Sequence, residues 1–191
     1  MTDRLILRRL GPADLDDLAE LHGDPAVMRF VDDGEPVPRE VVAARTLPEI
    51  LAEYDRLPEG LGRFALAERE TGAFVGWVSL RPADSVGLEE FPGLELGYRL
   101  RPTVWGRGYA AEGARALIRR AFEDFNGSGY GHGYDRVAAT TMTVNTASRR
   151  VMEKAGLRYV RTFFADWPGY IEGAEHGDVV YARSLDELRT A

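Results

Sequence analysis

The most informative stretch of this chain is Leu94-Glu-Leu-Gly-Tyr-Arg-Leu-Arg-Pro-Thr-Val-Trp-Gly-Arg-Gly-Tyr-Ala-Ala-Glu112. Alternating apolar residues over 94–101 predict a strand that ends at Pro102. A turn containing Gly106 and Gly108 follows and opens directly into a helical pattern. Such a turn points several backbone N–H groups at one place, where the helix dipole adds positive potential. The stretch therefore predicts a site for a phosphate or pyrophosphate, with an unliganded strand-to-helix turn as the plain alternative.

Two other nucleotide-binding turns compete with this interpretation. A P-loop is excluded because no Lys-Ser/Thr pair follows the glycines. The residues Gly106-Arg-Gly-Tyr-Ala-Ala111 do match the dinucleotide fingerprint G-x-G-x-x-A. That fingerprint follows a continuously apolar parallel strand, whereas Glu95, Arg99 and Arg101 interrupt this one. A dinucleotide-binding oxidoreductase is therefore the weaker hypothesis.

The rest of the chain alternates between strand and helix periodicities. Strands are predicted at 4–10, 63–68, 73–80, 94–101, 136–144, 157–166 and 178–184. Helical spacing covers 15–21, 41–54, 110–125 and 146–155, and a Gly-rich loop is expected at 126–134. This order, β-αα-βββ-α-β-α-ββ, predicts one α/β (α+β) domain over residues 1–191. Its sheet is expected to be mixed, mostly antiparallel, of about seven strands, and flanked by helices.

Composition excludes several functional classes. The 191 residues carry 24 basic and 31 acidic side chains, a net charge of −7, and no cysteine. Disulfides, thiolate zinc sites and a cysteine nucleophile are therefore excluded, and the three histidines lack the spacing of metal ligands. There is no apolar run of about 18 residues and no signal-peptide pattern at the N-terminus, so a cytoplasmic protein without a membrane partner is expected.

Charge is unevenly distributed along the chain. Residues 99–154 contain ten basic and five acidic side chains, whereas the remainder contains 14 basic and 26 acidic ones. The acidic total argues against a nucleic-acid partner. The local basic excess surrounds the glycine turn and therefore suits a phosphate-rich small ligand.

The segment Trp105-Gly-Arg-Gly-Tyr-Ala110, followed by Glu112, resembles the coenzyme A pyrophosphate loop of the GNAT acetyltransferase superfamily. These residues are similar to the pattern of its ribosomal-protein N-terminal acetyltransferase (RimJ/RimL-like) branch. Thr103 departs from the Gln or Arg that opens the family pattern Gln/Arg-x-x-Gly-x-Gly/Ala. A second segment, residues 145–157, resembles that branch's Asn-x-x-Ser-x-x-Val-x-Glu-Lys-x-Gly-Phe pattern. The resemblance implies a GNAT fold and an acetyl-CoA-dependent N-acetyltransferase.

The resemblance also implies where the coenzyme lies. Strands 94–101 and 136–144 would splay apart, and the pantetheine arm would pair with the backbone edge between them. A backbone N–H of the first strand would polarise the thioester carbonyl. The residues expected to contact the coenzyme are Tyr98, Leu100, Arg101, Trp105, Gly106, Arg107, Gly108, Tyr109, Ala110, Asn145, Arg149, Arg150 and Lys154. Asn145 also suits a helix N-cap, and a solvated basic face is the alternative for Arg149, Arg150 and Lys154.

Two residues are predicted to carry the chemistry. Many family members place a Tyr on helix 146–155 as the acid for the departing thiolate, but the aligned residue here is Met152. Ser148, one turn earlier, is the predicted donor or thiolate partner, since a thiol with a pKa near about 8.5 leaves without a strong acid. Glu95 is the predicted base, acting directly or through water, with a structural carboxylate as the alternative. Glu95, Gly97 and Arg99 share one face of their strand.

The predicted function is acetyl transfer from acetyl-CoA to a primary amine, without a metal. A protein N-terminus and a small molecule are both compatible acceptors, and a homodimer is compatible with the sequence. A non-catalytic acyl-CoA-binding module is the alternative of a different class, because Met152 stands at the usual position of the acid. The dinucleotide-binding oxidoreductase ranks third.

Overall fold

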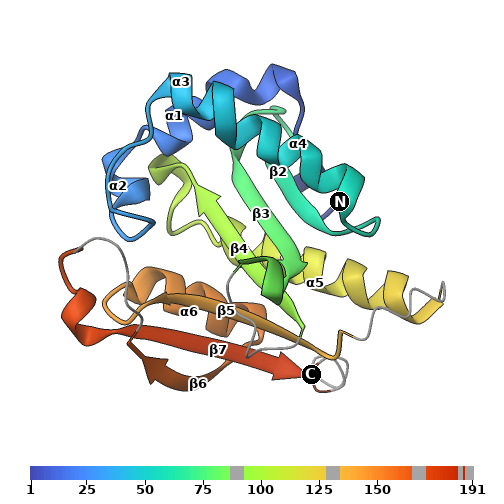
Figure 1. The fold of residues 1–191 in the computed structure, drawn as a ribbon. Helices are drawn as coiled ribbons and strands as arrows, with labels where there is room; N and C mark the ends of the chain where they lie inside the picture. Colours follow the sequence, from blue (N-terminus) through green and yellow to red (C-terminus); the bar gives the residue numbers. More distant parts are fainter. Residues whose placement is uncertain (87–92, 128–133, 165–170, 185–186, 188–191) are drawn as a thin grey trace.

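The computed structural model describes residues 1–86, 93–127, 134–164, 171–184 and 187. They form one sheet with helices on both faces (Figure 1). The strands are β1 (Leu5–Arg9), β2 (Gly62–Glu68), β3 (Phe74–Pro82), β4 (Leu94–Leu100), β5 (Arg136–Met142), β6 (Arg158–Phe163) and β7 (Asp178–Ser184). The α-helices are α1 (Leu15–His22), α2 (Pro25–Met28), α3 (Arg39–Val41), α4 (Leu47–Arg56), α5 (Tyr109–Gly127) and α6 (Thr146–Ala155).

The strands lie in the order β1-β2-β3-β4-β5-β7-β6, and only the pair β4–β5 is parallel. Helix α5 makes the crossover between these two strands, as a parallel connection requires. The expected α+β fold with a mixed, mostly antiparallel sheet is therefore confirmed. The strand expected at 157–166 is shorter than predicted, and residues 165–166 lie outside the described part of the chain.

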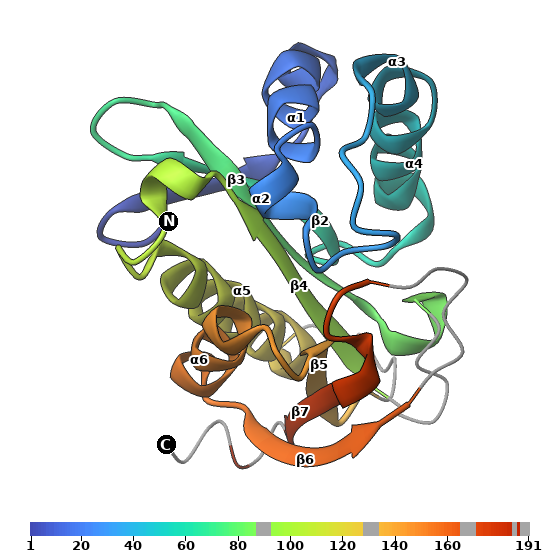
Figure 2. The same ribbon diagram turned by 90° about the vertical axis from the view of Figure 1, so that its left-hand side faces the viewer.

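Helices cover the two faces of the sheet and enclose two hydrophobic cores. Helices α1 and α4 lie on one face, and α5 and α6 lie on the other (Figures 1 and 2). The core under α5 and α6 includes Leu80, Leu94, Leu96, Leu117 and Tyr181. The core under α1 and α4 includes Leu18, Leu21, Ile50, Phe74 and Trp77. Even-numbered residues of β4 thus face α5, and odd-numbered ones face α1, because side chains alternate along a strand.

The helix expected over 41–54 is divided. Helix α3 ends at Val41, a π-helical turn covers Val42–Thr46, and α4 begins at Leu47. Pro48, in the first turn of α4, has no backbone N–H and therefore cannot donate an α-helical hydrogen bond to residue 44. The wider turn avoids that missing bond. The short helix α2, capped by the Asp24 side chain, was not anticipated from the periodicity.

Helix α5 is the longest helix of the described residues. It begins at Tyr109 and continues to Gly127, so Asn126 belongs to the helix and not to the expected loop. Residues 128–133 of that loop lie outside the described residues. No helix of the described chain is both long and apolar enough to cross a membrane.

Candidate active site

Strands β4 and β5 are paired at only one end. Leu94 pairs with Val137 and Glu95 with Ala138, and beyond these residues the two strands diverge (Figure 1). The rest of β4 is paired with β3 alone. The sheet therefore contains an open backbone edge, and the splayed arrangement implied by the family resemblance is confirmed.

The backbone groups on that open edge can be assigned. The Arg101 N–H donates to the Val75 carbonyl at 2.9 Å, so the backbone groups of odd-numbered residues of β4 turn toward β3. Since these groups alternate along an antiparallel strand, the opposite edge carries those of even-numbered residues. The residues whose N–H and C=O groups point away from β3 are Leu96, Tyr98 and Leu100. The Leu96 N–H still belongs to the pairing of Glu95 with Ala138, and the Leu100 carbonyl accepts from Trp105, so the open groups are the Leu96 carbonyl, both groups of Tyr98 and the Leu100 N–H.

The glycine turn lies at the end of β4, directly before α5. Gly106 and Gly108 have φ angles of +77° and +80°, a region that favours glycine. No atom lies within 4 Å of the position that a Cβ would take at Gly106, so the space beside this backbone is open. The N–H groups of Tyr109, Ala110 and Ala111 precede the first helical bond, from Glu112 N–H to the Gly108 carbonyl at 3.0 Å. These donors make the turn suitable for an anion.

Side chains of the turn are anchored to their surroundings. The half-exposed Trp105 donates from Nε1 to the Leu100 carbonyl at 2.8 Å. Arg107 Nη1 contacts Glu68 Oε1 at 2.8 Å, and the Tyr109 hydroxyl donates to the same oxygen at 2.9 Å. Glu68 thus ties the turn to β2, while about half of the Arg107 side chain stays exposed.

The N-terminal segment also holds this turn, which sequence reasoning missed. Arg4 Nη1 donates to the Arg107 carbonyl at 3.0 Å, and Arg4 Nε donates to Glu112 Oε2 at 2.7 Å. The Thr2 hydroxyl contacts the other carboxylate oxygen of Glu112 at 2.6 Å. A carboxylate in the first turn of a helix was a visible signal, but its partners come from the far end of the chain.

The first turn of α6 is hydrogen-bonded to β4 through the Tyr98 side chain. Asn145 caps α6, since its Oδ1 accepts from the Ser148 N–H at 3.1 Å, while its Nδ2 donates to the Thr141 hydroxyl at 3.1 Å. The Tyr98 hydroxyl donates to the Ser148 carbonyl at 2.9 Å and lies 2.8 Å from Ser148 Oγ. Burial raises the pKa of Tyr98. The two hydroxyls therefore form a pair across the gap between β4 and α6.

The four remaining basic residues of the predicted coenzyme site are placed unequally. Arg101 turns toward α1, with Asp17 at 2.8 Å and Glu20 at 2.7 Å. Arg149 lies beside the end of β5 and donates to the Thr143 carbonyl at 3.1 Å. Of these four residues, Arg150 and Lys154 are exposed on α6. The assignment of Arg101 to the coenzyme thus has no supporting contact, and the other three stay predictions.

Glu95 lies where β4 loses its partner strand. Its Oε2 accepts from Arg81 Nη2 at 3.2 Å, and its Oε1 lies beside Gly97, 3.4 Å from where a Cβ atom would stand. The buried Ser79 hydroxyl is 2.6 Å from that same point, so a side chain at position 97 would collide with it. Burial raises the pKa of Glu95, and the Arg81 guanidinium opposes this effect.

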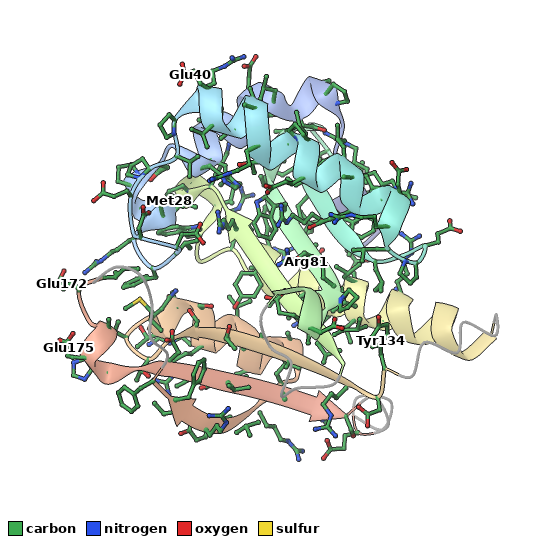
Figure 3. The ribbon with its side chains drawn as sticks, in the orientation of Figure 1. Met28, Glu40, Arg81, Tyr134, Glu172 and Glu175 are labelled. Atoms are coloured by element: carbon green, nitrogen blue, oxygen red, sulfur yellow. The ribbon has the colours of Figure 1, made fainter. Side chains whose placement is uncertain are left out.

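A cluster of arginines surrounds Glu95 on the α1 face of the sheet. Arg63, Arg81 and Arg99 come from three adjacent strands, and Arg81 lies over the middle of the sheet in Figure 3. Glu53 of α4 contacts two of them, at 3.4 Å and 3.5 Å. His22 lies 3.3 Å from Arg99, and burial together with the arginine charges lowers its pKa to about 3. Sequence reasoning did not bring these residues together.

The sequence model of the Acetyltransferase (GNAT) domain matches residues 4–158, which include the open edge, the glycine turn and α6. The chain belongs to the GNAT acetyltransferase family. It is 37% identical to the FsC-acetyl coenzyme A-N(2)-transacetylase of Aspergillus fumigatus, over 97% of this chain and 76% of that protein.

Solved structures share the GNAT fold over nearly the whole chain. A GNAT-family acetyltransferase from Bacillus anthracis has a TM-score of 0.75 and 21% identity, covering 97% of this chain and 98% of that one. The RimL ribosomal L7/L12 alpha-N-protein acetyltransferase, solved in complex with coenzyme A, has a TM-score of 0.73 and 16% identity. It covers 97% of this chain and 96% of that one. The family match and the 37% identical relative identify the protein as an acyltransferase, and the oxidoreductase hypothesis is set aside.

No cluster of three or more His, Asp or Glu side chains that could hold a metal ion occurs among the described residues. Met152, at the position of the missing Tyr, is buried in the core and offers no proton. The polar groups next to the open edge are therefore Glu95 on one face and the Tyr98–Ser148 pair on the other.

Proposed function

We propose that this GNAT enzyme transfers the acetyl group of acetyl-CoA to the primary amine of a small molecule. The observation that carries the proposal is the position of Glu95. It is the last residue of β4 paired with β5, and one carboxylate oxygen faces Gly97 beside the open edge. A carboxylate there can take the proton of an amine held over the same edge, directly or through a water molecule.

The turn and the open edge of β4 fit coenzyme A. The open space at Gly106 and the free N–H groups of Tyr109–Ala111 suit the pyrophosphate. The edge groups of Leu96 and Tyr98 suit the amides of the pantetheine arm, which would add to β4 like a strand. Acetyl-CoA, when bound, supplies an activated acetyl thioester. A backbone N–H of β4 is then in position to polarise its carbonyl.

Glu95 and Arg81 work as a pair in this proposal. Burial makes the Glu95 carboxylate a stronger base than an exposed glutamate, because it raises the pKa. The Arg81 guanidinium at 3.2 Å favours the ionised carboxylate and opposes this rise in pKa. The proton leaves the amine for the carboxylate, and the amine nitrogen becomes a neutral nucleophile.

The Tyr98–Ser148 pair faces the opposite side of the edge and serves the departing thiolate. The Tyr98 phenol stays protonated at neutral pH because burial raises its pKa. With the Tyr98 proton directed to the Ser148 carbonyl, the Ser148 hydroxyl donates to the Tyr98 oxygen, and it would have to turn this proton from Tyr98 to the sulfur. Ser148 is therefore the proposed donor to the sulfur, and Tyr98 is its positioning residue.

The choice of a small-molecule acceptor rests on the 37% identical Aspergillus protein, whose name describes acetyl transfer to a nitrogen of FsC. Likeness to the RimL structure at 16% identity concerns the fold alone. The RimJ/RimL-like branch, with a protein N-terminus as acceptor, is therefore the second candidate.

An acceptor screen tests the proposal. The full chain is incubated with acetyl-CoA and either small primary amines or short peptides with free N-termini, and acetylated products are identified by mass spectrometry. We expect acetylated small amines with the wild type and a strong reduction with Glu95→Gln. Acetylation of peptides alone would overturn the small-molecule assignment. Binding of acetyl-CoA without any acetylated product would favour a non-catalytic module.

A further inference from the structure

The arginine cluster on the α1 face is under-satisfied. Among the described residues, every hydrogen bond or ion pair of Arg63, Arg81 and Arg99 is 3.2 Å or longer. Their side chains are only 15–18% exposed. Charge-assisted hydrogen bonds usually measure about 2.7–2.9 Å. Buried charges without short partners are costly, so the cluster is suited to a further anionic group.

Structural arginines elsewhere in the same chain behave differently. Arg101 contacts its two carboxylates at 2.7 Å and 2.8 Å, and Arg107 contacts Glu68 at 2.8 Å. Even the exposed Arg39 pairs with Asp16 at 2.6 Å. Contacts of 3.6 Å and 3.7 Å also occur for Arg29 and Arg158, but those side chains are mostly exposed. The cluster is distinguished by long contacts on arginines that are largely buried.

Arg99 is the member of the cluster that is most available to a ligand. Its carboxylate contact is Asp32 at 3.6 Å, and the Asp32 side chain is 71% exposed. Its other contacts are His22 at 3.3 Å, the Met28 sulfur at 3.6 Å and the Trp77 ring, whose centroid lies 5.4 Å from the guanidinium carbon. None of these carries a negative charge. Asp32 has a φ of +52°, the one positive φ of a non-glycine residue in the described chain. An exposed, strained aspartate is a weak partner that another carboxylate can displace.

The cluster lies beside the point where the amine is proposed to react. Arg99 and Glu95 flank Gly97 on the same face of β4, each about 7 Å along the strand from it. The floor between them is Gly97, with the Trp77 ring beside it and the buried Ser79 hydroxyl, which has no hydrogen-bond partner among the described residues. If Glu95 holds the acceptor amine over Gly97, a second group of the acceptor, a few bonds away from that amine, lies within reach of the Arg99 guanidinium.

We propose that the acceptor carries an anionic oxygen group, such as a carboxylate, and that Arg99 binds this group with Arg63 and Arg81 behind it. This inference rests on the proposed function, since it concerns the acceptor of the same reaction. Displacement of Asp32 from Arg99 accompanies binding. A cationic polyamine, by contrast, would meet three guanidinium groups next to its amine.

Matched acceptors test this subsite. Initial rates are compared for β-alanine, 4-aminobutyrate and L-ornithine against their carboxamides, with rates expressed per neutral amine. For at least one pair we expect the carboxylate to have a kcat/KM about tenfold or more above that of its carboxamide. Arg99→Gln should remove this preference through KM, and Asp32→Asn should lower KM for the carboxylate. Arg39→Gln, which removes a surface pair, should change neither.

A binding measurement separates this inference from the proposed function. Thermal unfolding is followed with saturating coenzyme A and each acceptor, a complex that cannot turn over. The carboxylates should raise Tm more than the carboxamides in the wild type and in Arg99→Lys, and equally little in Arg99→Gln. Equal effects of both acceptor types in the wild type overturn the anion subsite, even if amines are acetylated. Absence of acetylation with the Tm difference intact overturns the proposed function alone.

Discussion

Glu95 is the residue on which the proposed chemistry depends. Replacing it with Gln keeps its size and removes the proton acceptor. We expect kcat to fall about 100-fold, a usual contribution of general base catalysis, with KM for acetyl-CoA unchanged. Initial-rate kinetics with both substrates measure this. Glu20→Gln, on the exposed side of α1, is the control that should retain full activity.

The pH profile gives the same residue a second test. Burial raises the pKa of Glu95, so its carboxylate takes up a proton at a higher pH than an exposed glutamate does. With rates expressed per neutral amine, the kcat/KM of the wild type should therefore begin to fall at a pH above the range in which an exposed glutamate takes up its proton. The Glu95→Gln profile, expressed in the same way, should be flat there. An acid limb that persists unchanged in Glu95→Gln assigns the base to another group.

For single residues, the sequence predicted positions better than surroundings. Glu95 and Ser148 were proposed from the family resemblance, both lie at the open edge, and their catalytic roles stay predictions. Tyr98 was expected to contribute only its backbone groups. No local sequence signal indicates that its side chain reaches α6. Arg63, Arg81 and Arg99 come together through strand register, which periodicity does not specify.

The glycine turn is the element whose conformation the coenzyme requires. Gly106→Ala places a side chain in the left-handed region, where it costs about 1–2 kcal/mol. We expect KM for acetyl-CoA to rise about tenfold, since the backbone must move to relieve this strain. Steady-state kinetics at saturating acceptor measure the effect.

Gly72 provides a matched control for this variant. It has a φ of +72° and no atom near its Cβ position, but it lies in the β2–β3 connection. Gly72→Ala should lose a similar amount of stability while KM for acetyl-CoA stays at the wild-type value. A similar rise in KM for both variants would contradict a specific role of the turn.

The N-terminal segment positions the same turn through Arg4. We expect Arg4→Met to raise KM for acetyl-CoA several-fold, because Arg107 and Glu112 lose their tie to this segment. Arg8→Met is the control: it also breaks an ion pair of a half-exposed arginine, with Asp14 in place of Glu112. Steady-state kinetics should show an unchanged KM for Arg8→Met. A KM that is unaffected by Arg4→Met removes this positioning role.

Boundaries of elements were predictable where a local signal marks them. Asn145 and Gly156 delimit α6 as its cap residues, and both were recognised from sequence. The division of 41–54 escaped prediction, although Pro48 gave the signal, because apolar spacing continues across the π-helical turn. The pairing of β4 and β5 at one end only came from the family resemblance and not from the strand patterns themselves.

Stability of the whole molecule should depend on His22. In the unfolded chain this histidine binds a proton below about pH 6.5, whereas in the folded protein its pKa is about 3. The unfolded state therefore takes up more protons as the pH falls, and stability is lost below pH 6.5. We expect His22 to contribute a loss of about 2 kcal/mol between pH 7 and pH 5.

Urea unfolding of the wild type and His22→Gln at the two pH values measures this contribution. Gln keeps an acceptor for the indole N–H of Trp77, which lies 3.2 Å from His22 Nε2. The free energy of unfolding of the variant should fall less with acidification than that of the wild type. Equal losses in the two proteins would show that His22 is protonated in the folded state.

Acetyl transfer to an amine releases coenzyme A, so its free thiol reports the proposed reaction. The chain contains no cysteine, and a thiol reagent therefore detects the released coenzyme without a background from the protein. With acetyl-CoA and a panel of small primary amines, we expect thiol release that requires the amine and equals the amount of acetylated product. Bound acetyl-CoA that releases no thiol above its hydrolysis rate with any amine or peptide would contradict the proposed reaction.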